Sequence, residues 1–181
     1  MEITKTTIEG LIILQPKVFK DERGYFLETF NEKVWNNHFE NPLKFVQDNE
    51  SLSKKHVLRG LHFQCPPFAQ GKLVRVTQGA VIDVAVDLRE DSPTYGKHIK
   101  VLLNDSNHKQ FYIPPGFAHG FVALEENTRF AYKCTNFYNQ KSEGAILWND
   151  PDLGIDWEVL NPLVSEKDAK SITFAKFDTP F

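Results

Sequence analysis

The sequence predicts a mainly β protein, an antiparallel sandwich or jelly-roll barrel with few short helices. Strand-like segments follow one another roughly every ten residues, and turn-forming residues separate them. Aromatic residues are numerous, with 15 Phe, 5 Tyr and 3 Trp, which favours a β-rich core or an aromatic-lined cavity. Short strands with regular turns are typical of sandwiches and jelly-roll barrels. A large barrel can hold a ligand inside, so polar residues that face inward need an explanation.

The N-terminal part of the chain carries the first strand signals. Short apolar runs stand on both sides of Asp21 to Gly24, which has the residue types of a tight turn, and they predict strands at 11–14, 18–19 and 25–30. Helix is a minor component. We expect one helix from Glu32 to Phe39 and a short one from Ser165 to Lys170, where Ser165 and Asp168 have the spacing of a capping box.

The middle of the chain carries most of the strand signals. Lys72 to Val76 ends at the turn Gln78-Gly79, and the strand Val81 to Leu88 follows. In that strand valines alternate with Asp83 and Asp87, so the two aspartates share the opposite face. Further strands are expected at 98–103, 111–113, 117–124, 129–138 and 144–148.

The totals indicate one soluble domain, residues 1–181, because no linker, repeat or break in composition divides the chain. The net charge of −3 provides no general positive field, so we expect neither nucleic acid nor a membrane surface as a partner. The apolar runs are too short to span a membrane. Cys65 and Cys134 lack C-x-x-C spacing and no secretory leader is evident, which favours a reducing cytoplasm.

The segment Arg59 to Gln64 is the strongest functional signal, because Gln47-Asp48-Asn49 precede it closely and Gln70-Gly71-Lys72 follow. This combination suits binding of an anionic ligand while the neutral imidazole of His62 removes a proton and nearby cations hold the resulting oxyanion. The alternative is a set of polar residues on the wet face of a sheet. A base needs an orienting partner, and Asp83 or Asp168 could serve.

Other polar residues have two interpretations each. His119 follows a rigid Pro-Pro-Gly bend and is either a ligand contact or a turn histidine bonded to backbone. Tyr132 and Tyr138 are six residues apart, so on an unbroken strand they share a face. One phenol could then donate a proton and the other stack on a ring, although two aromatics at a sheet rim are the commoner case. Glu143 also has an ordinary surface interpretation.

A metal site is not expected. Barrels of this kind often hold a metal through a His-x-His motif, and here the second position of that motif is Gln64. An amide is a poor substitute for an imidazole ligand, and the sequence shows no other dense cluster of metal ligands.

Taken in order, these motifs resemble the dTDP-4-dehydrorhamnose 3,5-epimerase family of the cupin superfamily. The resemblance covers nearly the whole chain and is carried by residues 21–26, 47–49, 59–64, 70–76, 83–89, 92–96, 113–121, 132–134, 148–150 and 165–168. It implies a cupin-type jelly roll, a dTDP-sugar substrate and no cofactor. It also implies a homodimer whose N-terminal strands are exchanged or shared near the active sites.

The resemblance also implies a role for individual residues. His62 would be the base, Asp168 its partner, Tyr132 the acid and Lys72 the cation beside the enolate oxygen. Tyr138 would stack on the thymine. The other substrate-binding positions would be Arg23, Glu28, Gln47, Asp48, Asn49, Arg59, His119, Glu143 and Lys167.

The residues suit this chemistry in their own right. In a 4-keto-6-deoxy sugar, C3 and C5 flank the carbonyl, so a base can remove either proton to give an enolate. Inversion requires the new proton to arrive on the opposite face, so base and acid must be different groups, as His62 and Tyr132 are. Arg23 and Arg59 offer planar forks for the diphosphate.

The leading hypothesis is therefore cofactor-free epimerisation at C3 and C5 of dTDP-4-keto-6-deoxy-D-glucose to dTDP-4-keto-L-rhamnose, a step of dTDP-L-rhamnose biosynthesis. One alternative is an epimerase that inverts only C5 or C3 of another nucleotide deoxysugar. Another is a cupin that binds a nucleotide sugar without catalysis, against which the set of His62, Tyr132 and Lys72 counts. A metal-dependent cupin dioxygenase or isomerase is disfavoured by Gln64.

Overall fold

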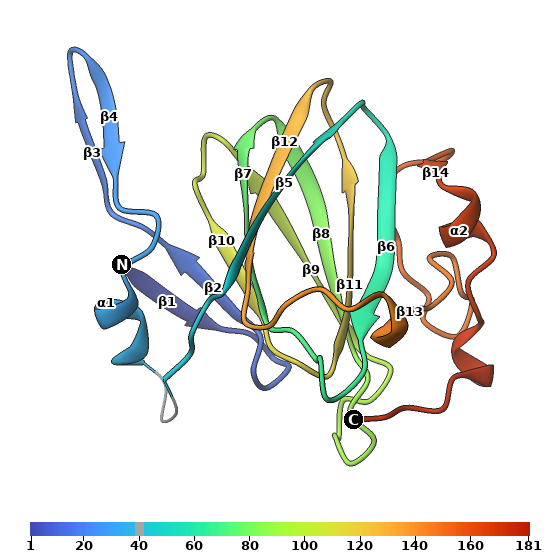
Figure 1. The fold of residues 1–181 in the computed structure, drawn as a ribbon. Coiled ribbons are helices and arrows are strands. Elements are labelled where there is room, and N and C mark those ends of the chain that lie inside the picture. The colour runs from blue at the N-terminus through green and yellow to red at the C-terminus, as the bar shows by residue number, and fades with distance from the viewer. Residues whose placement is uncertain (39–41) are drawn as a thin grey trace.

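Two six-stranded, largely antiparallel sheets form the body of the protein in the computed structural model, which describes residues 1–38 and 42–181 (Figure 1). The first sheet has the order β1 (Glu2–Lys5), β2 (Ile12–Gln15), β10 (Gln110–Ile113), β7 (Lys72–Gln78), β12 (Thr128–Cys134) and β5 (Gln47–Ser53). The second has the order β13 (Glu143–Ala145), β6 (Val57–Gln64), β11 (Phe117–Ala123), β8 (Ala80–Asp87) and β9 (His98–Asn104), and β14 (Leu163–Val164) runs parallel to β6. The predicted mainly β, cupin-type fold is confirmed.

The sheets enclose one core and are covered outside by two others. Inward-facing residues of both sheets, such as Val74, Ala85 and Phe121, form the central core. The outer face of the second sheet packs against the C-terminal part of the chain, and the outer face of the first packs around Trp35 of α1 (Glu32–Asn36). Because both faces of β8 are covered, all eight of its residues are buried. The predicted alternation holds there, with Val84 and Val86 in the outer core.

Helix is as scarce as predicted, and its ends are corrected. Besides α1, the described residues contain α2 (Glu166–Ala169) and the 3-10 helices Gln140–Ser142 and Phe174–Lys176. The expected helix 32–39 ends at Asn36, and Phe39 lies outside the described residues. Ser165 caps α2 by accepting a hydrogen bond from the Asp168 N–H, at 3.1 Å between nitrogen and oxygen. No helix of the described residues is long and apolar enough to cross a membrane.

Three strand predictions ran too far. The segment 129–138 leaves the sheet after Cys134, and the segment 144–148 leaves it after Ala145. After Cys134 the backbone forms the loop that carries Tyr138. After Ala145 it continues to Ile146, which still hydrogen-bonds to Leu61 and packs on the outer face of the second sheet. Strand 25–30 likewise ends at Leu27.

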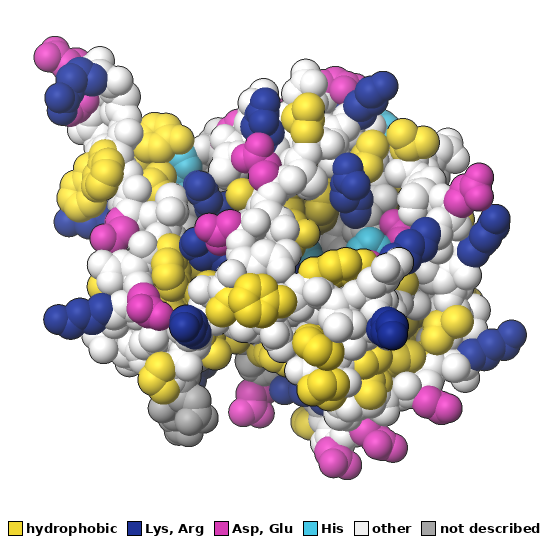
Figure 2. Space-filling view, viewed as in Figure 1, with side chains coloured by type: hydrophobic (Ala, Val, Ile, Leu, Met, Phe, Trp, Pro, Cys, Tyr) yellow, Lys and Arg dark blue, Asp and Glu magenta, His cyan; other side chains and the backbone are white. Residues whose placement is uncertain are grey.

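A hairpin of β3 (Val18–Asp21) and β4 (Gly24–Leu27) stands away from the two sheets (Figure 1). Figure 2 shows charged side chains at its tip and hydrophobic ones below them. Phe19, Tyr25 and Phe26 are all exposed. Large exposed apolar side chains on a projecting element indicate a surface that another chain can cover.

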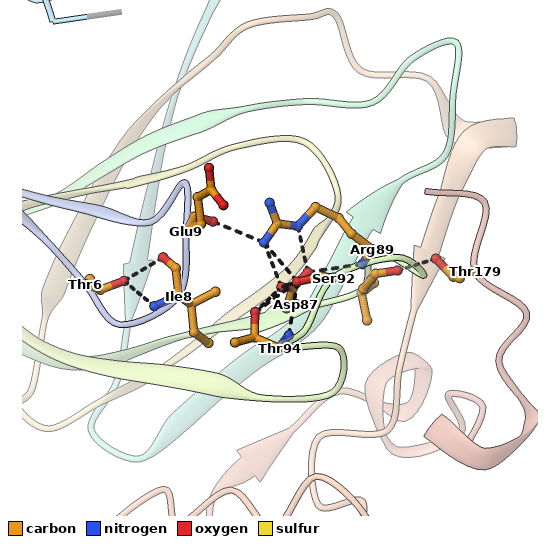
Figure 3. Close-up of polar contacts among 9 residues, drawn as sticks. Thr6, Ile8, Glu9, Asp87, Arg89, Ser92, Thr94 and Thr179 are labelled. Atoms are coloured by element: carbon orange, nitrogen blue, oxygen red, sulfur yellow. Dashed lines mark hydrogen bonds and ion pairs between the residues drawn. The ribbon is translucent and has the colours of Figure 1, made fainter.

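The buried carboxylate of Asp87, at the end of the barrel away from the β3–β4 hairpin, connects several segments of the chain (Figure 3). It accepts hydrogen bonds from Arg89, from the Ser92 hydroxyl at 2.6 Å and from the Thr94 hydroxyl at 2.6 Å. Arg89 also donates to the backbone oxygen of Glu9, at 3.1 Å. Burial by itself would raise the pKa of Asp87, but these bonds outweigh it and lower the pKa to about 2. The network joins the N-terminal segment to the barrel.

Candidate active site

A cavity of about 450 Å³ opens between the two sheets and contains most of the predicted reactive residues. His62 and Arg59 come from β6, His119 from β11, and Lys72 and Tyr132 from the facing sheet. Figure 2 shows a hollow in this face of the molecule with histidine side chains inside it. Lys167 and Asp168, from α2, complete one wall.

His62 and Asp168 form a tight pair, with 2.6 Å between His62 Nε2 and Asp168 Oδ1. The second carboxylate oxygen accepts a longer bond from the Gly60 N–H, at 3.4 Å. Burial would raise the pKa of Asp168, but the hydrogen bond and charge of His62, with help from Gly60 and Ser165, outweigh it and lower the pKa. Asp168 therefore stays ionised and orients the imidazole.

A bulge in β6 puts Arg59 and His62 on the same side of the strand. Residues three apart on a regular strand face opposite ways. Here the pairing with β11 shifts by one residue, since His119 is opposite His62 while Phe121 is opposite Arg59. Gly60 lies in the bulge with φ of 138°, and a Cβ there would be 2.5 Å from Gly120 Cα, so only glycine fits.

Tyr132 and Lys72 face His62 from the other sheet. They lie on adjacent strands, because Tyr132 is opposite Val74 and Lys72 is opposite Cys134 in the pairing of β12 with β7. Burial raises the pKa of the Tyr132 phenol, so it remains protonated at neutral pH and can donate. Burial lowers the pKa of the Lys72 ammonium, although Cys134, Asp83 and Glu143 partly oppose this. The candidate base His62 and the candidate acid Tyr132 thus stand on opposite walls of the cavity.

His119 belongs to a second histidine–aspartate pair. Its Nε2 is 2.9 Å and 3.1 Å from the two oxygens of Asp83, and both side chains are buried. The sequence allowed either Asp83 or Asp168 as the partner of His62. The structure pairs Asp168 with His62 and Asp83 with His119. The alternative of a turn histidine bonded to backbone is wrong, since the partner is a carboxylate. Burial lowers the pKa of His119, with Asp83 opposing, so the ring is neutral at pH 7.

Tyr138, Glu143 and Lys167 form a chain of contacts at the rim of the cavity. The Tyr138 hydroxyl donates to Glu143 Oε2 at 3.1 Å, and the same oxygen is 2.6 Å from Lys167 Nζ. Tyr138 is 56% exposed and lies beyond the end of β12. The even spacing of Tyr132 and Tyr138 therefore does not place them on one strand face, and that argument was wrong; the loop brings Tyr138 to the rim instead.

Strand β5 presents the predicted amides. Gln47 Nε2 donates to Asn49 Oδ1 at 3.0 Å, and Gln47 Oε1 accepts from the Tyr138 N–H at 3.0 Å. Asp48 alternates to the other face, where its carboxylate is 2.9 Å and 3.0 Å from Lys133 Nζ. The structure thus separates Asp48 from the cavity and keeps Gln47 and Asn49 near its rim.

Arg23 and Glu28 are not brought to the cavity of their own chain. The Arg23 side chain is 86% exposed at the hairpin tip, where it pairs with Asp21. Glu28 follows β4 and accepts a hydrogen bond from Asn31 Nδ2 at 3.2 Å. Neither residue lines the cavity.

Both the nitrogen and the oxygen of the Gln64 side-chain amide are hydrogen-bonded to backbone groups. Nε2 donates to the backbone oxygens of Phe68 and Phe137, at 2.6 Å and 3.2 Å, and Oε1 accepts from the Asn139 N–H at 2.7 Å. It holds the loop that carries Tyr138. In the part of the chain that the structure describes, no group of three or more His, Cys, Asp or Glu residues could hold a metal ion.

Sequence reasoning missed the serines of β5. Ser53 Oγ accepts a hydrogen bond from Arg59 Nε at 3.2 Å, and Arg59 also donates to the backbone oxygen of Leu52 at 3.3 Å. These bonds aim the guanidinium at the mouth of the cavity. The signal that could have found them is alternation, because Gln47, Asn49, Ser51 and Ser53 share one face of the strand.

A cupin-type barrel with a cavity between its sheets, lined by a histidine–aspartate pair and a facing tyrosine, has the features of an enzyme. A family model described as dTDP-4-dehydrorhamnose 3,5-epimerase matches residues 5–176, and the chain belongs to this family.

Curated relatives and solved structures agree with that assignment. The dTDP-4-dehydrorhamnose 3,5-epimerase of Shigella flexneri is 51% identical over 178 residues, 98% of each chain. That of Methanothermobacter thermautotrophicus is 54% identical over 169 residues, 91% of this chain and 89% of its own. The dTDP-6-deoxy-D-glucose-3,5-epimerase of Legionella pneumophila, solved with dTDP-4-keto-L-rhamnose, superimposes with a TM-score of 0.94 at 47% identity, covering 98% of this chain and 94% of its own.

Proposed function

We propose that this chain epimerises C3 and C5 of dTDP-4-keto-6-deoxy-D-glucose to give dTDP-4-keto-L-rhamnose, a step of dTDP-L-rhamnose biosynthesis. The observation that carries the proposal is the His62–Asp168 pair facing Tyr132 across a cavity, with Lys72 in the cavity lining on the strand next to that of Tyr132. The sugar nucleotide bound to the Legionella relative supports the substrate. Proton removal and return need no redox change, so the reaction requires no organic cofactor.

The first half of the reaction forms an enolate. His62, held by the ionised Asp168, takes the proton from the carbon next to the carbonyl. Negative charge develops on the carbonyl oxygen, and the Lys72 ammonium in the cavity wall stabilises it. The neutral His119 beside it adds a polar group without adding repulsion between cations.

The second half returns a proton to the other face of the same carbon. Tyr132 is suited to this because burial keeps its phenol protonated and it stands on the wall opposite His62. The same pair can act on C3 and C5, since both carbons flank the carbonyl. Arg59 and Lys167, at the cavity mouth, supply positive charge for the diphosphate.

The direct test is proton exchange. Incubation with dTDP-4-keto-6-deoxy-D-glucose in deuterated buffer should give inverted product carrying deuterium at C3 and C5, read by NMR. The control is the substrate alone in the same buffer. Label at one carbon would support the narrower epimerase, and absence of label would support a binding protein instead.

Tyr138 should hold the thymine. Base–aromatic stacking contributes about 1–3 kcal/mol, so Tyr138→Ala should weaken dTDP binding roughly five- to 150-fold by calorimetry. Tyr138→Phe keeps the ring and loses only the bond to Glu143, so it should bind nearly as well. Phe137→Ala is the matched control, because Phe137 is an equally exposed neighbouring aromatic at 61%. Equal affinities of Tyr138→Ala and the parent would mean that the ring does not meet the base.

We propose that the active unit is a homodimer in which the β3–β4 hairpin of one copy completes the cavity of the other. Three features support it: Arg23 and Glu28 lie far from the cavity of their own chain, the hairpin projects from the body, and its aromatic side chains are exposed (Figure 1). In the partner cavity Arg23 would meet the diphosphate, and its planar fork suits that group.

A mixing experiment tests this arrangement. Arg23→Ala and His62→Asn alone should each show little activity at low substrate concentration. Co-expressed, half of the dimers are hybrids, and one site in each hybrid has an intact cavity and an intact hairpin, so about a quarter of the parental activity should return. If no activity returns on mixing, Arg23 acts in its own chain; if Arg23→Ala alone keeps the parental activity, Arg23 does not contribute at all.

The location that fits these features is a reducing cytoplasm. Both cysteines, Cys65 and Cys134, are free thiols, and free thiols persist where disulfides are kept reduced. We offer this location as part of the proposal.

A further inference from the structure

Among the residues that the structure describes, one polar side chain in the cavity wall has no hydrogen-bond partner. Along the inward face of β5, Gln47 and Asn49 bond to each other and Ser53 bonds to Arg59. Between them, the Ser51 hydroxyl oxygen is buried and has no hydrogen bond within the described residues. Buried hydroxyl groups are nearly always bonded, because leaving one unsatisfied costs free energy. An unbonded hydroxyl in a ligand cavity points to a bond that the ligand supplies.

The position of Ser51 indicates which group of the ligand would bond to its hydroxyl. Ser51 lines the cavity and is opposite Phe130 in the pairing of β5 with β12. The next inward pair along the strands is Asn49 with Tyr132, and in the other direction Ser53 holds Arg59. Ser51 therefore lies between the candidate acid and the guanidinium at the mouth.

We propose that Ser51 Oγ hydrogen-bonds the hydroxyl on carbon 2 of the bound sugar; this rests on the function proposed above. In that substrate carbon 1 carries the diphosphate, which Arg59 is placed to meet, and carbon 3 is a reacting carbon, which Tyr132 serves. The hydroxyl between them is on carbon 2. Two hydroxyl groups suit each other, because each can donate or accept. Ser51 thus fixes the ring between its anchored and its reacting ends.

The test is a cycle of two enzymes and two substrates. Parent protein and Ser51→Ala are each assayed on dTDP-4-keto-6-deoxy-D-glucose and on its 2-deoxy analogue. With the full substrate, Ser51→Ala should lower kcat/KM roughly three- to tenfold, mainly through KM, as expected for one lost hydrogen bond. With the 2-deoxy analogue the two proteins should be nearly equal, because the bond is already missing.

Two further variants, Ser106→Ala and Ser51→Thr, serve as controls. Ser106→Ala removes an exposed hydroxyl in the β9–β10 turn, where Oγ donates to Asp105 at 3.2 Å, and should change neither substrate's kcat/KM. Ser51→Thr keeps a hydroxyl and should recover activity on the full substrate. If Ser51→Ala does not fold, Ser51→Cys takes its place in the cycle, because a thiol is a weak donor of similar shape.

The outcomes separate the two proposals. If the parent does not turn over the full substrate, the proposed function fails and this inference fails with it. If the parent is active but Ser51→Ala equals it on the full substrate, or loses the same factor on both substrates, only the bond to carbon 2 is refuted. A water molecule or the neighbouring walls would then account for the buried hydroxyl.

Discussion

His62→Asn should abolish both solvent exchange and inversion, lowering turnover by roughly 10²–10⁴-fold, the usual contribution of a general base. Asparagine can still hydrogen-bond to Asp168 but has no basic nitrogen, so no enolate forms. The measurements are deuterium wash-in at C3 and C5 by NMR and the rate of product formation. Calorimetry with dTDP is the control for binding, and the affinity should be close to that of the parent, because in the proposed arrangement His62 meets the sugar and not the nucleotide.

Asp168→Asn tests the role of Asp168 in orienting His62, separately from proton removal by His62 itself. It removes the charge beside His62 Nε2 while keeping an oxygen that can accept the Gly60 N–H. Exchange should fall by up to roughly 10⁴-fold, because the asparagine N–H₂ group that then faces His62 Nε2 donates a hydrogen bond to it and favours the wrong tautomer of the imidazole. For the other variant, His62→Asn, deuterium exchange at the parental rate would show that a different group removes the proton.

Tyr132→Phe should uncouple exchange from inversion. The base is intact, so His62 can remove a proton and return one from solvent to the same face, while delivery to the opposite face lacks its donor. Deuterium should therefore enter recovered substrate while inverted product falls by roughly 10²–10⁴-fold. NMR of both species in one reaction gives the ratio directly.

Tyr132→Phe should also preserve the packing around the ring. Tyr132 lies against Phe130, with ring centroids 6.2 Å apart, and a phenylalanine ring keeps that contact. The thermal midpoint should thus change little. If Tyr132→Phe inverted the sugar at the parental rate, the donor would have to be a water molecule or another side chain.

Features that depend on consecutive residues could be predicted before the structure was known. The alternation of β8 predicted its two faces, and the structure places Asp83 and Asp87 inside as that pattern indicates. Turn residues placed most strand ends, and the ordered motifs identified the family. Local patterns succeed here because strand periodicity and turn conformation depend on neighbours in the chain. The same patterns failed for Tyr138, because nothing in the alternation shows that β12 stops at Cys134.

Which residues meet in the site depends on how the sheets and α2 pack together. Asp168 is 106 residues from His62, and its pairing with His62 rather than His119 follows from where α2 packs against β6. The bulge at Gly60 turned Arg59 to the same side as His62, a change of face that a regular strand forbids. The unbonded Ser51 hydroxyl is visible only once every neighbour is placed. Contacts of this kind depend on how two sheets pack and on which buried polar groups find partners, and residues far apart in the chain supply both halves of each contact.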